Sequence, residues 1–158
     1  MIYSRSVEYA LRALTHLAAL PRGARKMARE IAAEEDAPLF YLAKTLQQLA
    51  RRGILHSVKG PSGGFSLNRP ACKISLMDVV DALDGSDGFE RCAAGLPACD
   101  DETPCPLHDI YKPVRQTVIR YLTRTTLTDL ADELERKQKA AARRKARKKS
   151  SSSRKVGH

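Results

Sequence analysis

The sequence contains no tryptophan and few other aromatic residues, which together make up 5% of its 158 positions. It also has no apolar run that approaches the roughly 20 residues needed to span a membrane. The N-terminal segment Met1–Glu8 lacks the apolar core of a signal peptide. These absences predict a cytoplasmic protein with no membrane partner.

Signatures of catalysis are missing as well. There is no Ser–His–Asp set, and the glycine-rich stretch 60–64 lacks the Lys–Ser/Thr ending of a phosphate-binding loop. The chain is therefore not expected to be an enzyme.

Charge is distributed unevenly along the chain, whose formal net charge is +10. Residues 1–73 carry 12 Lys and Arg against 5 Asp and Glu, residues 74–135 carry 5 against 13, and residues 136–158 carry 11 against none. A basic front suits a polyanion such as DNA, whereas an acidic middle should face away from phosphates.

The basic tail, residues 136–158, consists mostly of Ala, Lys, Arg and Ser and is expected to be disordered. Since Ala, Arg and Lys favour helix, its first part is expected to extend the preceding helix only transiently. A flexible basic segment neutralises phosphates without reading sequence. Deleting the tail is therefore expected to weaken DNA binding at low salt, unless it stays solvated or folds back on the acidic middle.

The front half, residues 1–73, predicts a winged helix-turn-helix within a mainly α-helical fold. Apolar residues at helical spacing predict three helices, of which the third starts near Pro38 and ends at Gly53. Strands predicted over 54–58 and 65–67 enclose a flexible turn and form the wing. In the third helix the predicted buried stripe consists of Leu39, Leu42, Leu46 and Leu49.

The other face of the third helix carries side chains that hydrogen-bond to DNA. The second helix of a helix-turn-helix enters the major groove, and a glycine-rich wing lets the backbone approach phosphates closely. The alternative is a face that is only solvated and a turn that is only a hairpin. The predicted DNA contacts are Tyr41, Lys44, Thr45, Gln48 and Arg52 in the helix, and Lys59, Ser62 and Gly63 in the wing.

After the wing, Ser75 and Asp78 predict a capping box that opens a short helix. A longer amphipathic segment follows, and Thr126 to Asp129 then caps a final short helix that reaches about Glu135.

The apolar stripe of the long amphipathic segment exceeds what a small body can cover, so a homodimer is expected, with packing on the first helix of the same chain as the alternative. The stripe consists of Leu107, Ile110, Tyr111, Val114, Val118, Tyr121 and Leu122.

Three cysteines and a histidine share one short acidic stretch with the spacing C-x6-C-x5-C-x2-H. These residues are Cys92, Cys99, Cys105 and His108. Nearby glycine and prolines make the stretch an irregular loop, which can aim several side chains at one point. Thiolates and imidazoles bind soft or borderline metals, so the loop predicts a metal centre. Cys72 lies outside it and is expected to be a small buried residue.

Residues 1–135 resemble the IscR/NsrR group of iron–sulfur winged-helix repressors. The matching pieces are Tyr9-Ala-Leu-Arg-Ala-Leu14 in the first helix, Tyr41-Leu42 in the third, Val58-Lys-Gly-Pro-Ser-Gly-Gly-Phe-Ser-Leu67 in the wing, the cysteine loop, and Thr126-Leu127 before the last helix. The resemblance implies a DNA-binding repressor, a homodimer on a near-palindromic operator, whose DNA affinity is controlled by a cluster that senses nitric oxide, iron supply or redox state. The implied parts are residues 1–73 for DNA binding, residues 74–135 for cluster and dimerisation, and the tail 136–158.

In this group the three loop cysteines hold the cluster, which maps to Cys92, Cys99 and Cys105. The fourth ligand is implied to be either His108, as in the IscR-like branch, or Glu8 from the partner, as in the NsrR-like branch. A [2Fe–2S] cluster is favoured and a [4Fe–4S] cluster is the alternative. The same residue types also allow two alternatives to a cluster: a structural Cys₃His zinc site and a metal-free thiol–disulfide switch. The remaining alternative function is that of an electron-transfer protein.

Overall fold

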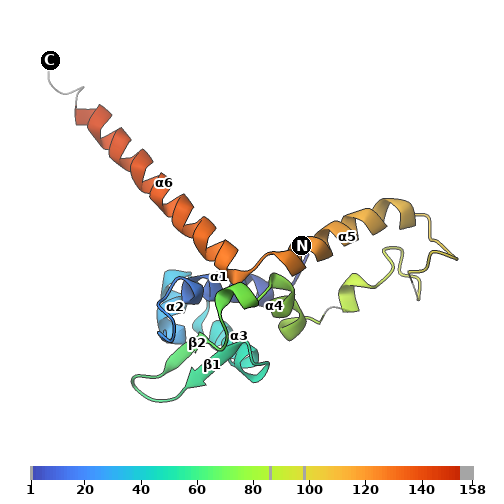
Figure 1. Ribbon diagram of the computed structural model, residues 1–158, viewed down its shortest axis with the longest axis horizontal. Helices are drawn as coiled ribbons and strands as arrows, with labels where there is room; N and C mark the ends of the chain where they lie inside the picture. The colour runs from blue at the N-terminus through green and yellow to red at the C-terminus, as the bar shows by residue number, and fades with distance from the viewer. Residues whose placement is uncertain (1, 86, 98, 154–158) are drawn as a thin grey trace.

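The computed structural model describes residues 2–85, 87–97 and 99–153, with side chains as far as Lys145. The chain folds into helices and one small hairpin (Figure 1), so the predicted mainly α-helical class is confirmed. None of the described helices is long and apolar enough to cross a membrane. The elements are α1 (Arg5–Ala18), α2 (Ala28–Glu34), α3 (Leu39–Arg51), β1 (Leu55–Val58), β2 (Gly64–Leu67), η1 (Ala71–Lys73), α4 (Leu76–Leu83), η2 (Asp87–Phe89), α5 (His108–Arg124) and α6 (Leu127–Ser153).

The core lies where α1, α3 and α4 meet. The side chain of Ser4 caps α1 by accepting a hydrogen bond from the Val7 N–H. Leu14, Leu46 and Val79, one from each helix, have no exposed surface. Burying a large aliphatic side chain contributes about 1.5–3 kcal/mol, so these apolar faces hold the helices together. The predicted helix-turn-helix is confirmed as α2 packed on α3, which in turn packs on α1.

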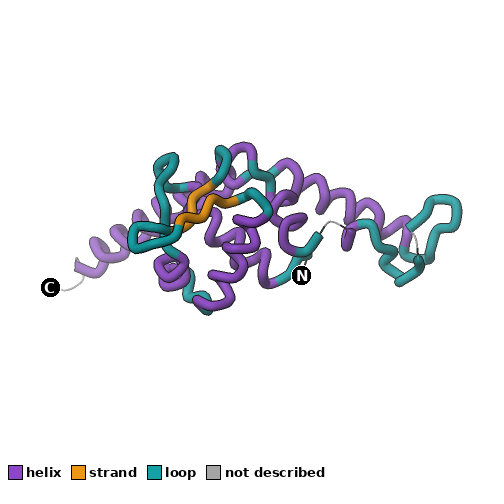
Figure 2. Tube along the Cα trace, turned by 90° about the horizontal axis from the view of Figure 1, so that it is seen from below, coloured by secondary structure: helices purple, strands orange, loops and turns teal. Residues whose placement is uncertain are grey.

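The wing consists of β1, β2 and the turn 59–63 between them. The strands are antiparallel, with Leu55 opposite Leu67 and Val58 opposite Gly64. Gly64 has φ +132°, and a Cβ there would lie 2.7 Å from the Lys26 carbonyl oxygen, so only glycine fits. Lys26 also bridges to Phe65, which ties the hairpin to the segment before α2. Figure 2 shows the hairpin on one side of the helical body.

The two C-terminal helices leave the body in different directions (Figure 1). α5 ends in contact with α4, and its other end carries the cysteine loop, residues 92–108, away from the body. Its predicted apolar stripe is largely uncovered in the single chain. The exposed members are Leu107 at 46%, Ile110 at 74%, Tyr111 at 39%, Val114 at 54% and Tyr121 at 44%.

α6 differs most from the sequence-based expectation. The capping box of Thr126 and Asp129 is present, but the helix continues to Ser153 instead of ending near Glu135. The predicted disorder of the tail is therefore wrong over residues 136–153, while residues 154–158 lie outside the described part. Ala, Arg and Lys have strong helix propensity, and Lys139 forms an i,i+4 ion pair with Glu135.

Candidate functional site

The outward face of α3 is rotated relative to the predicted one. Phe40, Lys44, Gln47 and Arg51 recur at helical spacing and are all exposed. Thr45 is only 4% exposed, and its hydroxyl donates to the Tyr41 carbonyl oxygen. Its predicted DNA contact is therefore contradicted. Thr45 stands three residues after Leu42 and four before Leu49, a spacing that already places it on the buried side.

Two other predicted contacts of α3 already contact neighbouring helices: Tyr41, which stays 38% exposed, and Gln48, which is half-buried. The Tyr41 hydroxyl lies 2.6 Å from Ser6 Oγ, and its ring packs edge-on against Tyr9. The Gln48 amide donates to the Ala82 carbonyl oxygen of α4 at 3.4 Å. Both side chains therefore fix α3 against its neighbours, and Gln47 takes the exposed position that Gln48 was predicted to hold.

The remaining predicted contacts lie at the end of α3 and in the wing. Arg52, Lys59 and Ser62 are exposed. Gly63 is buried, its N–H donates to the Gly60 carbonyl oxygen, and an added Cβ would lie 2.2 Å from the Val58 carbonyl oxygen. A close approach of Gly63 to DNA is therefore not available, because this residue closes the turn from inside.

The cysteine loop lies between α4 and α5, at the far end from the wing (Figure 1). Cys92 and Cys105 are each 8% exposed and His108 is 6% exposed. Three predicted ligands are therefore shielded from solvent: His108 at the start of α5, and Cys92 and Cys105 in irregular segments. Cys99 is half-buried.

Cys99 and His108 form one pair of donors. The Cys99 sulfur lies 3.6 Å from His108 Nδ1, and His108 Nε2 lies 2.7 Å from an Asp101 carboxylate oxygen. Lys112 of α5 pairs with the same carboxylate at 2.6 Å. A carboxylate on one ring nitrogen favours the tautomer that leaves the other nitrogen free to bind a metal. Sequence reasoning did not identify Asp101 or Lys112 as partners of His108.

Cys92 and Cys105 form the second pair. Backbone N–H groups of Ala94 and then Leu96 point at the Cys92 sulfur and, with the nearby Cys105 side chain, hold the pKa of the Cys92 thiol below its usual range. Such N–H groups favour the thiolate, which is the form that binds metals and reacts with oxidants.

Within the described residues, no three Cys, His, Asp or Glu side chains converge as in a ready-made metal site. Glu8, the other predicted ligand, lies on α1 near Tyr3, which is itself next to Tyr121 of α5. Tyr121 and His108 are thirteen helical residues apart, about 20 Å. Glu8 of the same chain is therefore remote from the cysteine loop.

An open cavity of about 640 Å³ lies beside Cys99, lined also by Phe89, Pro97 and Arg115. Arg115 Nη1 is buried and has no hydrogen-bond partner among the described residues. Buried polar groups normally have partners. A negatively charged group in this cavity would satisfy the guanidinium.

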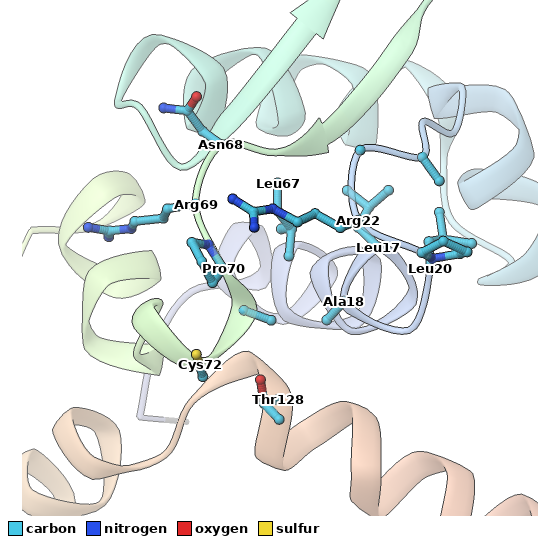
Figure 3. Close-up of a pocket in the computed structure, with 14 residues that line it drawn as sticks. Leu17, Ala18, Leu20, Arg22, Leu67, Asn68, Arg69, Pro70, Cys72 and Thr128 are labelled. Atoms are coloured by element: carbon cyan, nitrogen blue, oxygen red, sulfur yellow. The ribbon is translucent and has the colours of Figure 1, made fainter.

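A second cavity, of about 320 Å³, lies between the end of α1, the end of β2, η1 and the start of α6 (Figure 3). Arg22 and Arg69 line it, and Arg69 also pairs with Asp78 at 3.3 Å. Cys72 lines it as well and is exposed, so the prediction that Cys72 is buried is wrong. In this short turn the core position is taken by Ile74, which has no exposed surface.

The chain as a whole is similar to known proteins. Residues 3–133 match the model of the Rrf2 family, described as iron-dependent transcriptional regulators. The chain belongs to the Rrf2 family. A protein of Aquifex aeolicus (strain VF5) described as an HTH-type transcriptional regulator is 35% identical to this Rrf2 protein over 132 residues, which are 82% of this chain and 91% of that protein. The HTH-type transcriptional regulator IscR of Klebsiella pneumoniae (strain 342) is 28% identical over 106 residues, which are 67% of this chain and 64% of that protein.

Solved structures agree with this assignment. CymR of B. subtilis, described as its global cysteine regulator, is 25% identical with a TM-score of 0.67, covering 82% of this chain and 95% of that one. The oxidized form of Staphylococcus aureus CymR is 27% identical with a TM-score of 0.66, covering 83% and 96%. T. potens IscR, at 23% identity and a TM-score of 0.69 over 85% and 89%, supports the fold alone. The Rrf2 protein is thus a transcriptional regulator, and its predicted resemblance to the IscR-type family is confirmed.

Proposed function

We propose that this Rrf2 protein is a repressor that binds DNA as a homodimer through α3 and the wing, and that an iron–sulfur cluster controls its DNA affinity. The observation that carries the proposal is the cysteine loop, where three shielded or half-buried thiols and His108 stand as two donor pairs. Cys92, Cys99 and Cys105 would hold the cluster, with a [2Fe–2S] centre favoured. The cluster would supply a redox-active group whose state changes with oxidants, nitric oxide or iron supply.

The surroundings of the loop support an anionic centre. A cluster ligated by three thiolates carries negative charge, and the cavity beside Cys99 is lined by Arg115, whose Nη1 has no hydrogen-bond partner among the described residues. The N–H groups of Ala94 and Leu96 favour the thiolate of Cys92. These are the donor types that a cluster needs. Because the two pairs do not converge within the described structure, binding would draw the loop together.

The connection of the loop to α3 suggests how such a change would reach DNA. The loop follows α4 in the chain, with the short helix η2 between them, and the C-terminal end of α4 contacts two other elements. The Ala82 carbonyl oxygen accepts from Gln48 of α3, and the Asp84 carboxylate accepts from the Ser4 N–H at the start of α1 at 2.8 Å. A shift of α4 would therefore move the recognition helix, which makes α4 the proposed coupling element.

The cluster is tested on protein purified without oxygen. Iron and sulfide content, the visible spectrum and the Mössbauer spectrum are measured for wild type and for Cys92→Ala, Cys99→Ala and Cys105→Ala. Each loop variant is expected to lose most of the iron, whereas the matched control Cys72→Ala, at an exposed cysteine outside the loop, keeps it. Stoichiometric zinc without sulfide would instead indicate a structural zinc site.

The fourth ligand is distinguished by two further variants. His108→Ala should change the spectrum if the histidine binds iron. Glu8→Ala should change it only if a carboxylate reaches the cluster from the partner, because Glu8 of the same chain is remote from the loop. If the purified dimer contained no iron and still bound a specific operator, the proposed DNA binding would stand and the proposed cluster would be wrong.

A thiol switch is the second candidate, favoured by the low pKa of the Cys92 thiol beside Cys105. Hydrogen peroxide would take two electrons and two protons from these thiols, giving one disulfide and two molecules of water. The S. aureus CymR structure in its oxidized form is a structural relative of the chain. This candidate predicts a Cys92–Cys105 disulfide, seen by mass spectrometry, in metal-free protein whose operator affinity changes reversibly with dithiothreitol.

A further inference from the structure

Phe40 is the most exposed of the large apolar side chains in the described structure, with 87% of its surface accessible. Leu39 beside it is 48% exposed. Both stand in the first turn of α3. Large apolar groups that gather on a surface mark contact sites. The first turn of α3 is therefore expected to contact another molecule.

The surroundings of Phe40 fit nucleic acid. It begins the outward stripe of α3 that continues through Lys44, Gln47 and Arg51. α3 contains no acidic residue at all, as its sequence LFYLAKTLQQLAR shows. A basic and amide-bearing stripe with an aromatic tip complements phosphates and base edges, whereas it offers no carboxylate to a basic protein partner.

We propose that Phe40 contacts the C5-methyl group of a thymine in the major groove and so selects the base at one position of each half-site. The inference rests on the proposed DNA binding through α3. Residues in the N-terminal part of a recognition helix contact base edges, and Phe40 is the second residue of α3. Its side chain has no hydrogen-bonding group, and the apolar feature that a base pair presents in the major groove is the thymine methyl.

Because Phe40 lies on the surface, its effect on DNA binding can be tested without disturbing the fold. A side chain that is 87% exposed contributes little to the core. Phe40→Ala should therefore fold with the unfolding midpoint of wild type. Phe40→Leu keeps an apolar tip that reaches a methyl group, and it serves as the conservative variant.

The experiment uses the full-length chain and a duplex selected by the wild-type protein from a random library. Each thymine of the half-site is replaced in turn by deoxyuridine, which removes the methyl group and keeps every hydrogen-bonding group. At one thymine, replacement should weaken wild-type binding about fourfold per half-site, as expected for one buried methyl group. The same replacement should leave Phe40→Ala unaffected, and Phe40→Leu should keep part of the sensitivity.

The outcomes separate this inference from the proposed function. If the wild-type protein selects no duplex, the proposed sequence-specific DNA binding is contradicted. If a duplex is selected and no thymine gives a loss that disappears in Phe40→Ala, the assignment of Phe40 is overturned while DNA binding stands. Equal weakening of Phe40→Ala on every duplex, including unselected ones, would also overturn it, because a methyl contact acts at a single base position.

Discussion

Two residues, Thr126 and Asp129, cap the N-terminus of α6 and so fix where this helix begins. Thr126 and Asp129 satisfy each other's backbone at the start of α6: the Thr126 N–H and hydroxyl both donate to the Asp129 carboxylate at 2.7 Å. The Thr126 N–H first, and then the hydroxyl, hold the pKa of Asp129 below its usual range. This local pair was readable in the sequence because a capping box needs only residues three apart.

Asp129→Ala is expected to lower the free energy of unfolding by about 0.5–1 kcal/mol at pH 7. Since the pKa of Asp129 is lower in the folded state, its stabilisation is present above the unfolded value near ~3.9 and is lost as the pH falls through the folded value. The matched control is Asp132→Ala, at an exposed residue of the same helix that has no hydrogen-bond or ion-pair partner among the described residues. Urea unfolding should separate the two variants at pH 7 and not at strongly acid pH; a difference that persists in acid would contradict the capping role.

At the scale of elements, the orientation of α3 decides which side chains are available to DNA. The leucine pattern identified the helix, but four apolar positions left its exact rotation open. Contacts with α1 and α4 resolve it: Tyr41 reaches Ser6 and Gln48 reaches Ala82. Leu39, predicted to be buried, is 48% exposed and is the first residue of α3.

Neighbouring glutamines test this orientation. Gln47→Ala is expected to weaken binding to a selected operator by about 1–3 kcal/mol and to relax preference at one base pair, because Gln47 is exposed on the outward stripe. Gln48→Ala should leave base preference unchanged and lower the free energy of unfolding by up to about 1 kcal/mol. Both are measured by fluorescence anisotropy on matched duplexes and by urea unfolding. The opposite pattern would show that α3 presents its other face.

At the scale of the whole molecule, two helices extend beyond the compact body with opposite chemistry. α5 exposes an apolar stripe, whereas the sequence of α6 is rich in basic residues. A stripe of this kind fits a second copy of the chain, whereas α6 beyond Glu135 has no apolar residue larger than alanine in its helical part. The two extensions are therefore expected to act separately.

Ile110→Asp is expected to weaken the dimer about 30-fold or more, as for a buried apolar anchor at an interface. Gln116→Asp introduces the same charge on the other side of α5 and should leave the association unchanged. Sedimentation equilibrium over a range of concentrations measures both. A monomeric wild type, or equal effects of the two variants, would contradict dimerisation through this stripe.

The structure changes the expected contribution of the basic tail to DNA affinity. α6 leaves the body on the side opposite the wing, so its far, basic end lies distant from both the wing and α3 (Figure 1). Charges in physiological salt are screened beyond about 8 Å. Deleting residues 139–158 should therefore leave the affinity for a short operator, and its salt dependence, unchanged. A flatter salt dependence after truncation would show that the arm bends back to the DNA.

Local interactions explain what the sequence determined. Helical spacing, capping pairs, the glycine-rich wing and the cysteine spacing predicted the winged helix-turn-helix, the exposed stripe of α5 and the loop that carries Cys92, Cys99 and Cys105. Each depends on residues close in the chain, where periodicity and backbone preferences act directly.

Tertiary structure decided the features that depend on residues far apart in sequence. Contacts with α1 and α4 turned Thr45 and Gln48 inward and left Phe40 and Gln47 outside. The fold of the loop brought Asp101 against His108, and the packing of the wing buried Gly63. The length of α6 also escaped prediction, since helix propensity and disorder compete closely in a basic segment and no buried face marks its end. Packing geometry, which a linear pattern does not contain, settled which side of each element faces a neighbour.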